Sequence, residues 1–198
     1  MLQPVELEAY GLLLRPWEES DLGAAQRGLS DPDFRRWNTA NSPTPDEGGA
    51  RRFIRSRTEG WEHGTTASFA VTEGGTVIGQ VGLGMIDFTM RNARVGYWVL
   101  PEGRGRGIAS RALEGVTRWA FRDLGLHRLE LGHAIGNDAS CGVARRCAYA
   151  LEGLLRGAMI DIAGMPRDIH LHARLATDAL PTDALATDAL PTDALPGT

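Results

Sequence analysis

The segment Pro101-Glu-Gly-Arg-Gly-Arg-Gly-Ile-Ala-Ser110 joins two apolar patterns of different period. Residues 94–100 before it have the pattern of a β-strand, and residues 107–124 after it place apolar side chains on one face of a helix. The start of a helix carries free N–H groups and the positive end of the helix dipole. Glycines let the backbone approach a ligand, and arginines add forked donors. The segment therefore predicts a site for an anion such as a phosphate or pyrophosphate.

Two common phosphate-binding motifs are excluded by the residues present. A dinucleotide motif Gly-x-Gly-x-x-Gly that starts at Gly103 or Gly105 would need its third glycine where Ile108 or Ser110 stands. The chain has no lysine, since all 21 basic residues are arginine. That excludes a Walker A loop and a lysine Schiff base with pyridoxal phosphate.

Composition indicates a globular protein of ordinary size. The chain has 198 residues, of which 42% are hydrophobic and 23% charged, enough for one domain with a real core. A formal net charge of −4 argues against general nucleic-acid binding, although residues 91–128 hold eight arginines against three carboxylates. There is neither an apolar run of roughly 18 residues nor a secretory signal pattern. We therefore expect a cytoplasmic protein that binds neither membranes nor nucleic acid.

Two parts of the chain differ in pattern. Residues 177–198 repeat Thr-Asp-Ala-Leu with proline or alanine after it, a period of five that fits neither helix nor strand. We interpret them as a low-complexity acidic tail and residues 1–176 as one α/β domain. Expected strands are 12–15, 68–72, 76–86, 94–100, 127–134, 149–155 and 167–174, and expected helices are 20–29 (capped by Ser20), 45–58 (capped by Thr44), 107–124 and 138–148.

At this point the sequence resembles a known family. Arg104-x-x-Gly107-x-Ala109 is similar to the acetyl-CoA pyrophosphate motif of GNAT N-acetyltransferases. The resemblance covers roughly residues 12–175 and is strongest to the ribosomal-protein N-acetyltransferase (RimJ/RimL) branch. It rests further on Leu14-Arg15-Pro16-Trp17, Gly96-Tyr97-Trp98-Val99, Leu124-Gly125-Leu126-His127-Arg128, Asn137-x-x-Ser140 and Glu152-Gly153-Leu154-Leu155-Arg156-Gly157.

The resemblance implies a fold and a reaction. The fold is the α/β GNAT fold, a mixed, mostly antiparallel sheet of six or seven strands with about four helices, in which two splayed strands form an acetyl-CoA slot. The reaction is direct transfer of acetyl from acetyl-CoA, a cosubstrate, to a primary amine in a ternary complex. The acceptor is left open between a protein N-terminal α-amine and a small amine such as an antibiotic or polyamine.

The resemblance also implies roles for individual residues. Asn137 would bind the pantetheine, cap a helix, or do both. Ser140 would be the general acid for the departing CoA thiolate, or only a serine in the first turn of a helix. An N–H near Val99 would polarise the thioester carbonyl. The backbone of Trp98, Val99 and Leu100 would pair with the pantetheine, and the loop that holds the pyrophosphate would comprise Arg104, Gly105, Arg106, Gly107, Ile108, Ala109 and Ser110.

The sequence departs from the family pattern where the acceptor and base would be assigned. Arg94 stands where the branch often has a glutamate, so a base at that position is missing. Glu73, Asp87 and His63 are the remaining candidates, although each also suits a surface or structural role. Tyr149 replaces a usual phenylalanine and is expected in the core.

Histidines and cysteines give no metal signature in the sequence. His127 and His133 share one strand face, as do His170 and His172, but no third ligand is evident. The chain has only two cysteines, too few for a disulfide framework. We therefore expect no metal.

Two other classes of function remain open. One is a CoA-binding module without transferase activity, and the other is an interaction protein that uses the acidic tail. As to assembly, a monomer or homodimer is expected, with Trp37 and Trp61 as candidate contacts.

Overall fold

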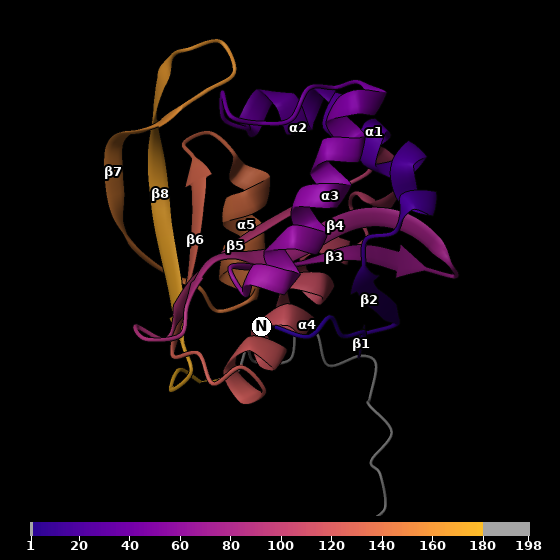
Figure 1. The fold of residues 1–198 in the computed structure, drawn as a ribbon. Helices are drawn as coiled ribbons and strands as arrows, with labels where there is room; N and C mark the ends of the chain where they lie inside the picture. The colour runs from indigo at the N-terminus through magenta and orange to yellow at the C-terminus, as the bar shows by residue number, and fades with distance from the viewer. Residues whose placement is uncertain (1, 180–198) are drawn as a thin grey trace, which may run out of the picture.

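The computed structural model describes residues 2–179, so most of the repeat, residues 180–198, lies outside the described part. One open sheet of eight strands, in the order β1-β2-β3-β4-β5-β6-β8-β7, runs through the molecule (Figure 1). All neighbouring strands are antiparallel except β5 and β6. The elements are β1 Leu7–Ala9, β2 Leu12–Pro16, α1 Leu22–Ser30, α2 Pro32–Trp37, α3 Glu47–His63, β3 Thr66–Glu73, β4 Thr76–Asp87, β5 Asn92–Val99, α4 Ile108–Arg122, β6 Arg128–Ala134, α5 Asp138–Arg146, β7 Ala150–Ile160 and β8 Pro166–Leu175, with 3-10 turns at Glu19–Asp21 and Pro101–Gly103.

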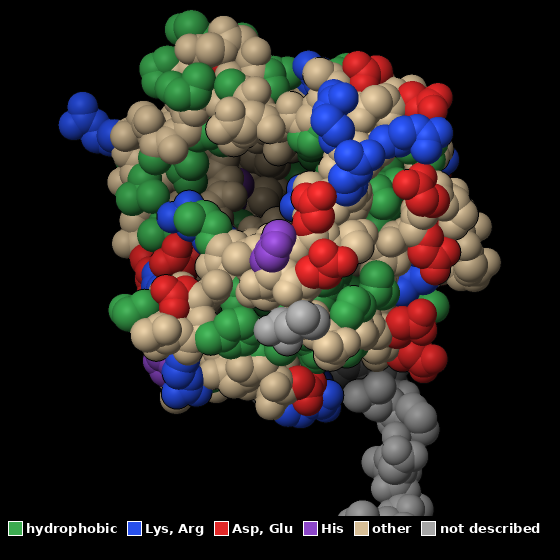
Figure 2. Space-filling model, in the orientation of Figure 1, with side chains coloured by type: hydrophobic (Ala, Val, Ile, Leu, Met, Phe, Trp, Pro, Cys, Tyr) green, Lys and Arg blue, Asp and Glu red, His purple; other side chains and the backbone are tan. Residues whose placement is uncertain are grey.

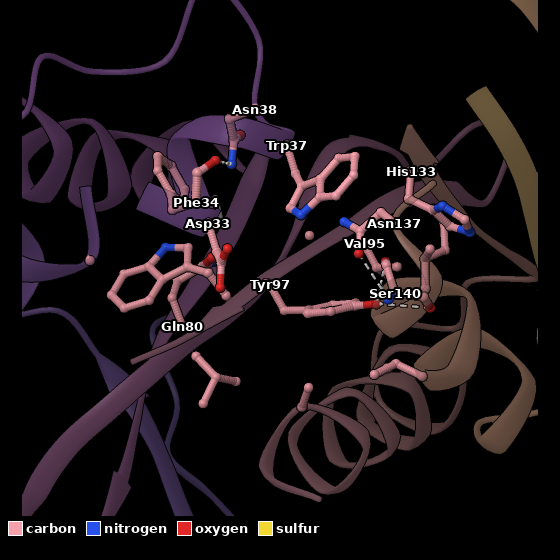
Figure 3. A pocket seen from close by; sticks show the side chains of 18 of the residues that line it. Asp33, Phe34, Trp37, Asn38, Gln80, Val95, Tyr97, His133, Asn137 and Ser140 are labelled. Atoms are coloured by element: carbon pink, nitrogen blue, oxygen red, sulfur yellow. Dashed lines mark hydrogen bonds between the residues drawn. The ribbon is translucent and has the colours of Figure 1, made fainter. Parts of the chain in front are cut away.

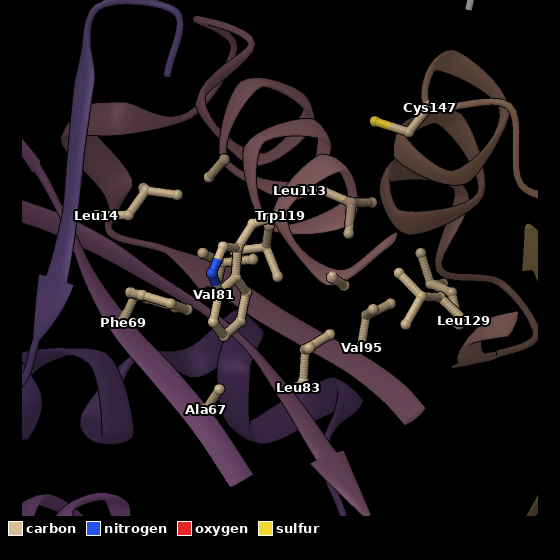
Figure 4. Packing of buried hydrophobic residues seen from close by; sticks show 14 of the residues in the cluster. Leu14, Ala67, Phe69, Val81, Leu83, Val95, Leu113, Trp119, Leu129 and Cys147 are labelled. Carbon is tan, nitrogen blue, oxygen red and sulfur yellow. The ribbon is translucent and has the colours of Figure 1, made fainter. Parts of the chain in front are cut away.

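Two hydrophobic clusters lie on opposite faces of the sheet. Successive strand residues point to opposite faces, and β3 accordingly sends Phe69 and Val71 into the larger cluster and Ala70 into the smaller one. The larger cluster packs α4 against the sheet (Figure 4). The smaller one packs α1 and α3. The predicted apolar face of α4 is confirmed as buried, and it comprises Ile108, Ala112, Leu113, Val116, Trp119 and Ala120.

Tyr149 lies in the core, as predicted. Its side chain is 1% exposed, and its hydroxyl lies 2.7 Å from Thr117 Oγ1. Trp61 is also buried, at 2% exposure, so the expectation that it contacts a second chain was wrong. Its ring packs edge-on against Phe69 instead. None of the described helices is long and apolar enough to cross a membrane.

Several local expectations need correction. The sheet has eight strands because β1, only three residues long, pairs with β2 across a tight turn. Helix α2 is a further short element that the pattern did not reveal. Helix α3 begins at Glu47 rather than at Pro45, because the side chain of Asp46 caps it by accepting from the Gly49 N–H at 2.6 Å. Likewise, residues 19–21 form a 3-10 turn ahead of α1, so Ser20 is not a helix cap.

The parallel pair β5–β6 is short, and this opens the sheet. Pairing joins Asn92–Arg94 to Arg128–Glu130 and goes no further. Strand β5 continues to Val99 while remaining paired with β4 on its other side. The edge of β5 beyond Arg94 is therefore free of β6, as the predicted splay requires.

Candidate active site

A cavity of ≈ 1100 Å³ lies where β5 and β6 separate. Its walls come from α1 and α2, from β4 and β5, from the loop before α4, and from the start of α5. Figure 2 shows the hollow on the surface, between the side of α5 and β6 and the side of α2 and α3.

The free edge of β5 presents backbone groups to this cavity. The Leu100 N–H donates to the Ile78 carbonyl oxygen at 2.9 Å, so it faces β4. Backbone groups alternate sides along an antiparallel ladder. Those of Tyr97 and Val99 therefore face the cavity, whereas those of Trp98 face β4.

This alternation corrects part of the sequence prediction. Val99 keeps an N–H on the free edge, but the backbone of Trp98 and Leu100 is turned toward β4 and cannot pair with a ligand there. Leu100 is also buried, at 1% exposure. The Trp98 side chain lines the cavity and packs beside Trp17 and Phe34.

The loop before α4 presents a cradle of backbone groups to the cavity. Gly105 and Gly107 have φ of 72° and 73°, a left-handed conformation that favours glycine. Gly107 is the N-cap of α4 and makes no side-chain cap hydrogen bond, and a Cβ added at either glycine would meet open space. The N–H groups of the first helical turn have no partner within the helix. The residues of this turn, Ile108, Ala109 and Ser110, line the cavity.

The two arginines of the loop are bonded to carboxylates rather than pointing free into the cradle. Arg104 donates to Asp33 Oδ2 at 2.9 Å and also binds Asp31, which ties the loop to α2. Arg106 binds Glu73 and does not line the cavity. In this conformation the predicted arginine donors hold the loop in place, and the cradle offers an anion only backbone N–H groups.

Two hydroxyl groups meet at the far end of the free β5 edge. The Tyr97 hydroxyl lies 2.7 Å from Ser140 Oγ, and both side chains line the cavity (Figure 3). Asn137, which also lines it, caps α5 by accepting from the Ser140 N–H at 3.1 Å. Burial raises the pKa of Tyr97, so this phenol stays protonated at neutral pH and can donate.

Comparison with known proteins identifies the fold. The profile of the acetyltransferase (GNAT) domain matches residues 11–149. The chain belongs to the GNAT acetyltransferase family. The resemblance seen in the sequence, to GNAT enzymes of the RimJ/RimL type, is thereby confirmed, together with the α/β GNAT fold.

Individual GNAT relatives agree with this assignment. A structure of Mycobacterium smegmatis RimJ in complex with CoA-disulfide has a TM-score of 0.78 and 25% identity, over 87% of each chain. The ribosomal-protein-serine acetyltransferase of Escherichia coli (strain K12) is 26% identical over 150 residues, which are 76% of this chain and 78% of that protein. YdaF of Bacillus subtilis (strain 168) is 32% identical over 101 residues, or 51% of this chain, and the match spans only 55% of YdaF.

The three base candidates of this GNAT chain do not line the cavity. Glu73 binds Arg106, and this hydrogen bond lowers the pKa of its carboxyl. Asp87 accepts from two N–H groups of a turn, and His63 ends α3. Arg94, which stands where the resemblance would place a glutamate, lines the cavity, with its side chain 65% exposed.

Proposed function

We propose that this chain transfers an acetyl group from acetyl-CoA to a primary amine while both are bound in the cavity. The observation that carries the proposal is the continuous free edge of β5. It leads from the backbone cradle at Gly107 to the Tyr97–Ser140 pair. Gly107 and the first turn of α4 would hold the pyrophosphate, and the Tyr97 backbone and the Val99 N–H would bind the acetyl-pantetheine arm as an added strand. The Val99 carbonyl oxygen already accepts from Arg104 Nε at 3.2 Å. Asn137 would help to hold the pantetheine while capping α5.

The Tyr97–Ser140 pair suits protonation of the leaving group. The amine attacks the thioester carbonyl, the C–S bond breaks, and the CoA thiolate takes a proton. Ser140 would give that proton, and Tyr97, 2.7 Å away, would stabilise the resulting alkoxide by donating to it. A serine alone is a weak acid, and a hydrogen bond from Tyr97 to the alkoxide would make Ser140 a better proton donor. The Val99 N–H would stabilise the negative charge on the carbonyl oxygen.

The amine must lose a proton, and the described residues that line the cavity hold no free carboxylate. Asp31 and Asp33 line it but both bind Arg104. We propose that the acceptor reacts from its neutral form and loses its proton to water.

A pH profile tests this point. We expect kcat/KM to rise tenfold per pH unit up to the pKa of the acceptor amine, about 8 for an α-amine and about 10 for a lysine amine. The measurement is kcat/KM from pH 6 to pH 10 on one peptide blocked at each amine in turn. A plateau that begins well below the pKa of the amine would show that an enzyme base acts and would contradict the proposal.

The acceptor is proposed from the name of a relative. Because the E. coli relative is named as an acetyltransferase of a ribosomal protein, we propose a protein acceptor, and we take its N-terminal α-amine as the reacting group, as the resemblance implies. Thiol release from acetyl-CoA would be measured with peptides, aminoglycosides and polyamines, alongside calorimetric titration with CoA. Turnover on a peptide α-amine supports the proposal. Tight CoA binding without turnover on any of them favours a CoA-binding module, and the lack of CoA binding overturns the proposed function.

The glycine cradle makes a separate prediction. Gly107→Val should weaken CoA binding about tenfold or more, because a β-branched side chain strains a left-handed position by 1–3 kcal/mol and projects into the cavity. Gly74→Val is the matched control, since Gly74 also has a positive φ of 57° and open space around it but does not line the cavity. Calorimetry with CoA should separate the two variants, and equal CoA affinity in both would contradict the cradle.

A further inference from the structure

Four side chains with metal-binding atoms meet beside the start of α5. They are His133 of β6, Cys141 of α5, and His170 and His172 of β8. One nitrogen or sulfur atom from each lies within 4.8 Å of all the others. The sequence expectation that no third ligand joins the histidine pairs was therefore wrong. Antiparallel pairing sets His133 opposite His170, and α5 supplies the cysteine.

Hydrogen bonds orient two of the imidazoles toward a common point. His133 Nδ1 lies 3.1 Å from the Ala134 carbonyl oxygen, and His172 Nδ1 lies 3.2 Å from that of Tyr149. A carbonyl oxygen only accepts, so each Nδ1 carries the proton of the neutral ring. Metal-bound histidines usually donate their other ring N–H to an oxygen in the same way.

The remaining nitrogens then face each other as acceptors. His133 Nε2 and His172 Nε2 are 3.2 Å apart. Two lone pairs at that distance repel unless a cation or an extra proton lies between them. Ligand nitrogens of a tetrahedral zinc site, with Zn–N distances of 2.0–2.1 Å, lie about 3.3 Å apart. The distance between these two nitrogens therefore already matches that between two ligands of one zinc ion.

The surroundings of the cluster also suit a metal ion. Cys141 and His170 are only half-buried, which leaves the cluster an approach from solvent. No described carboxylate belongs to the cluster, so its ligands are imidazole and thiol, the soft and borderline donors that suit zinc.

We propose that His133, Cys141, His170 and His172 bind one divalent transition metal ion, with Zn²⁺ the best match. Four protein ligands make a closed, structural site. Binding would release the thiol proton of Cys141 to solvent, because the thiolate is the ligand. The ion would join β6, β8 and α5, and would thereby hold the first turn of α5, where Ser140 directly precedes Cys141.

The first test is metal binding by the full chain, produced without a histidine tag. Titration with Zn²⁺ against a chromophoric chelator should give one ion per chain. The ion should raise the melting temperature by about 5 °C at a hundredfold excess over Kd. Co²⁺ should give the visible bands of a tetrahedral site and a thiolate-to-metal charge-transfer band. Failure of the wild-type chain to bind Zn²⁺ stoichiometrically would overturn the proposal, and the two Nε2 atoms would then share a proton.

Variants locate the ion. Cys141→Ser and His170→Gln change half-buried side chains and should leave the fold intact, whereas His172 is buried and its loss could disturb folding. Each of the two variants should weaken Zn²⁺ binding about 100-fold or more, and Cys141→Ser should also remove the cobalt charge-transfer band. His127→Gln, outside the cluster, is the control and should bind like the wild type. Wild-type affinity in both cluster variants would place the ion elsewhere and overturn the site.

Discussion

Replacing Ser140 by alanine is expected to lower kcat about 100-fold while leaving CoA affinity unchanged, since a positioned general acid contributes 10²–10⁴ to a rate. Tyr97→Phe should have an effect of similar size, because the two hydroxyls share one hydrogen bond of 2.7 Å. The double variant should lose little more than either single one, as groups that act as a unit are not additive. Steady-state kinetics with saturating acceptor, together with CoA titrations, measure all three.

Tyr149→Phe is the matched control for Tyr97→Phe. This change also removes a hydroxyl–hydroxyl hydrogen bond of 2.7 Å, the one between Tyr149 and Thr117. Tyr149, however, lies in the core and does not line the cavity. It should cost stability and leave kcat unchanged. Full activity in Ser140→Ala would show that Ser140 is not the general acid. Full activity in Tyr97→Phe alone would remove only the tyrosine from the mechanism.

Local patterns in the sequence were enough to predict the cradle and its helix. Gly107 and the apolar face of α4 lie within one segment, and both depend on neighbours at most a few turns away. The predicted strands 68–72 and 76–86 follow from alternation and turn residues in the same way. The short helix α2 was not predicted, because its six residues form less than two helical turns and show too little periodicity.

The Tyr97–Ser140 pair and the arginine contacts depend on distant parts of the chain. Tyr97 and Ser140 are 43 positions apart, and Arg104 reaches Asp31 across 73. Which backbone groups of β5 are free depends on its register with β4, since a shift of one residue exchanges the two sides. Register and long-range packing are set by the whole sheet and cannot be worked out from spacing in a single sequence.

The largest loss of stability is expected from Arg174→Met, about 3–5 kcal/mol in the free energy of unfolding, because it would remove the buried partner of a buried carboxylate. Glu114 of α4 has a side chain 0% exposed, and Arg174 of β8 one 3% exposed. Arg174 NH1 donates to Glu114 Oε2 at 2.5 Å and to the Cys147 carbonyl oxygen at 3.0 Å. After the change, Glu114 would keep only Arg118, whose side chain is 45% exposed. Urea unfolding of both proteins measures the difference.

Two further variants separate the buried charge from the contacts that Arg174 makes. Adding Glu114→Leu to Arg174→Met should restore most of the lost stability, because replacing both partners of a buried ion pair with apolar residues is often neutral. Arg51→Met removes exposed ion pairs with Glu47 and Glu19 and should leave the free energy of unfolding almost unchanged. If Arg174→Met lowers stability no more than Arg51→Met does, the Arg174–Glu114 pair does not stabilise the contact between α4 and β8. If the double variant is as unstable as Arg174→Met alone, the loss lies in packing and in the bond to Cys147 rather than in the isolated carboxylate.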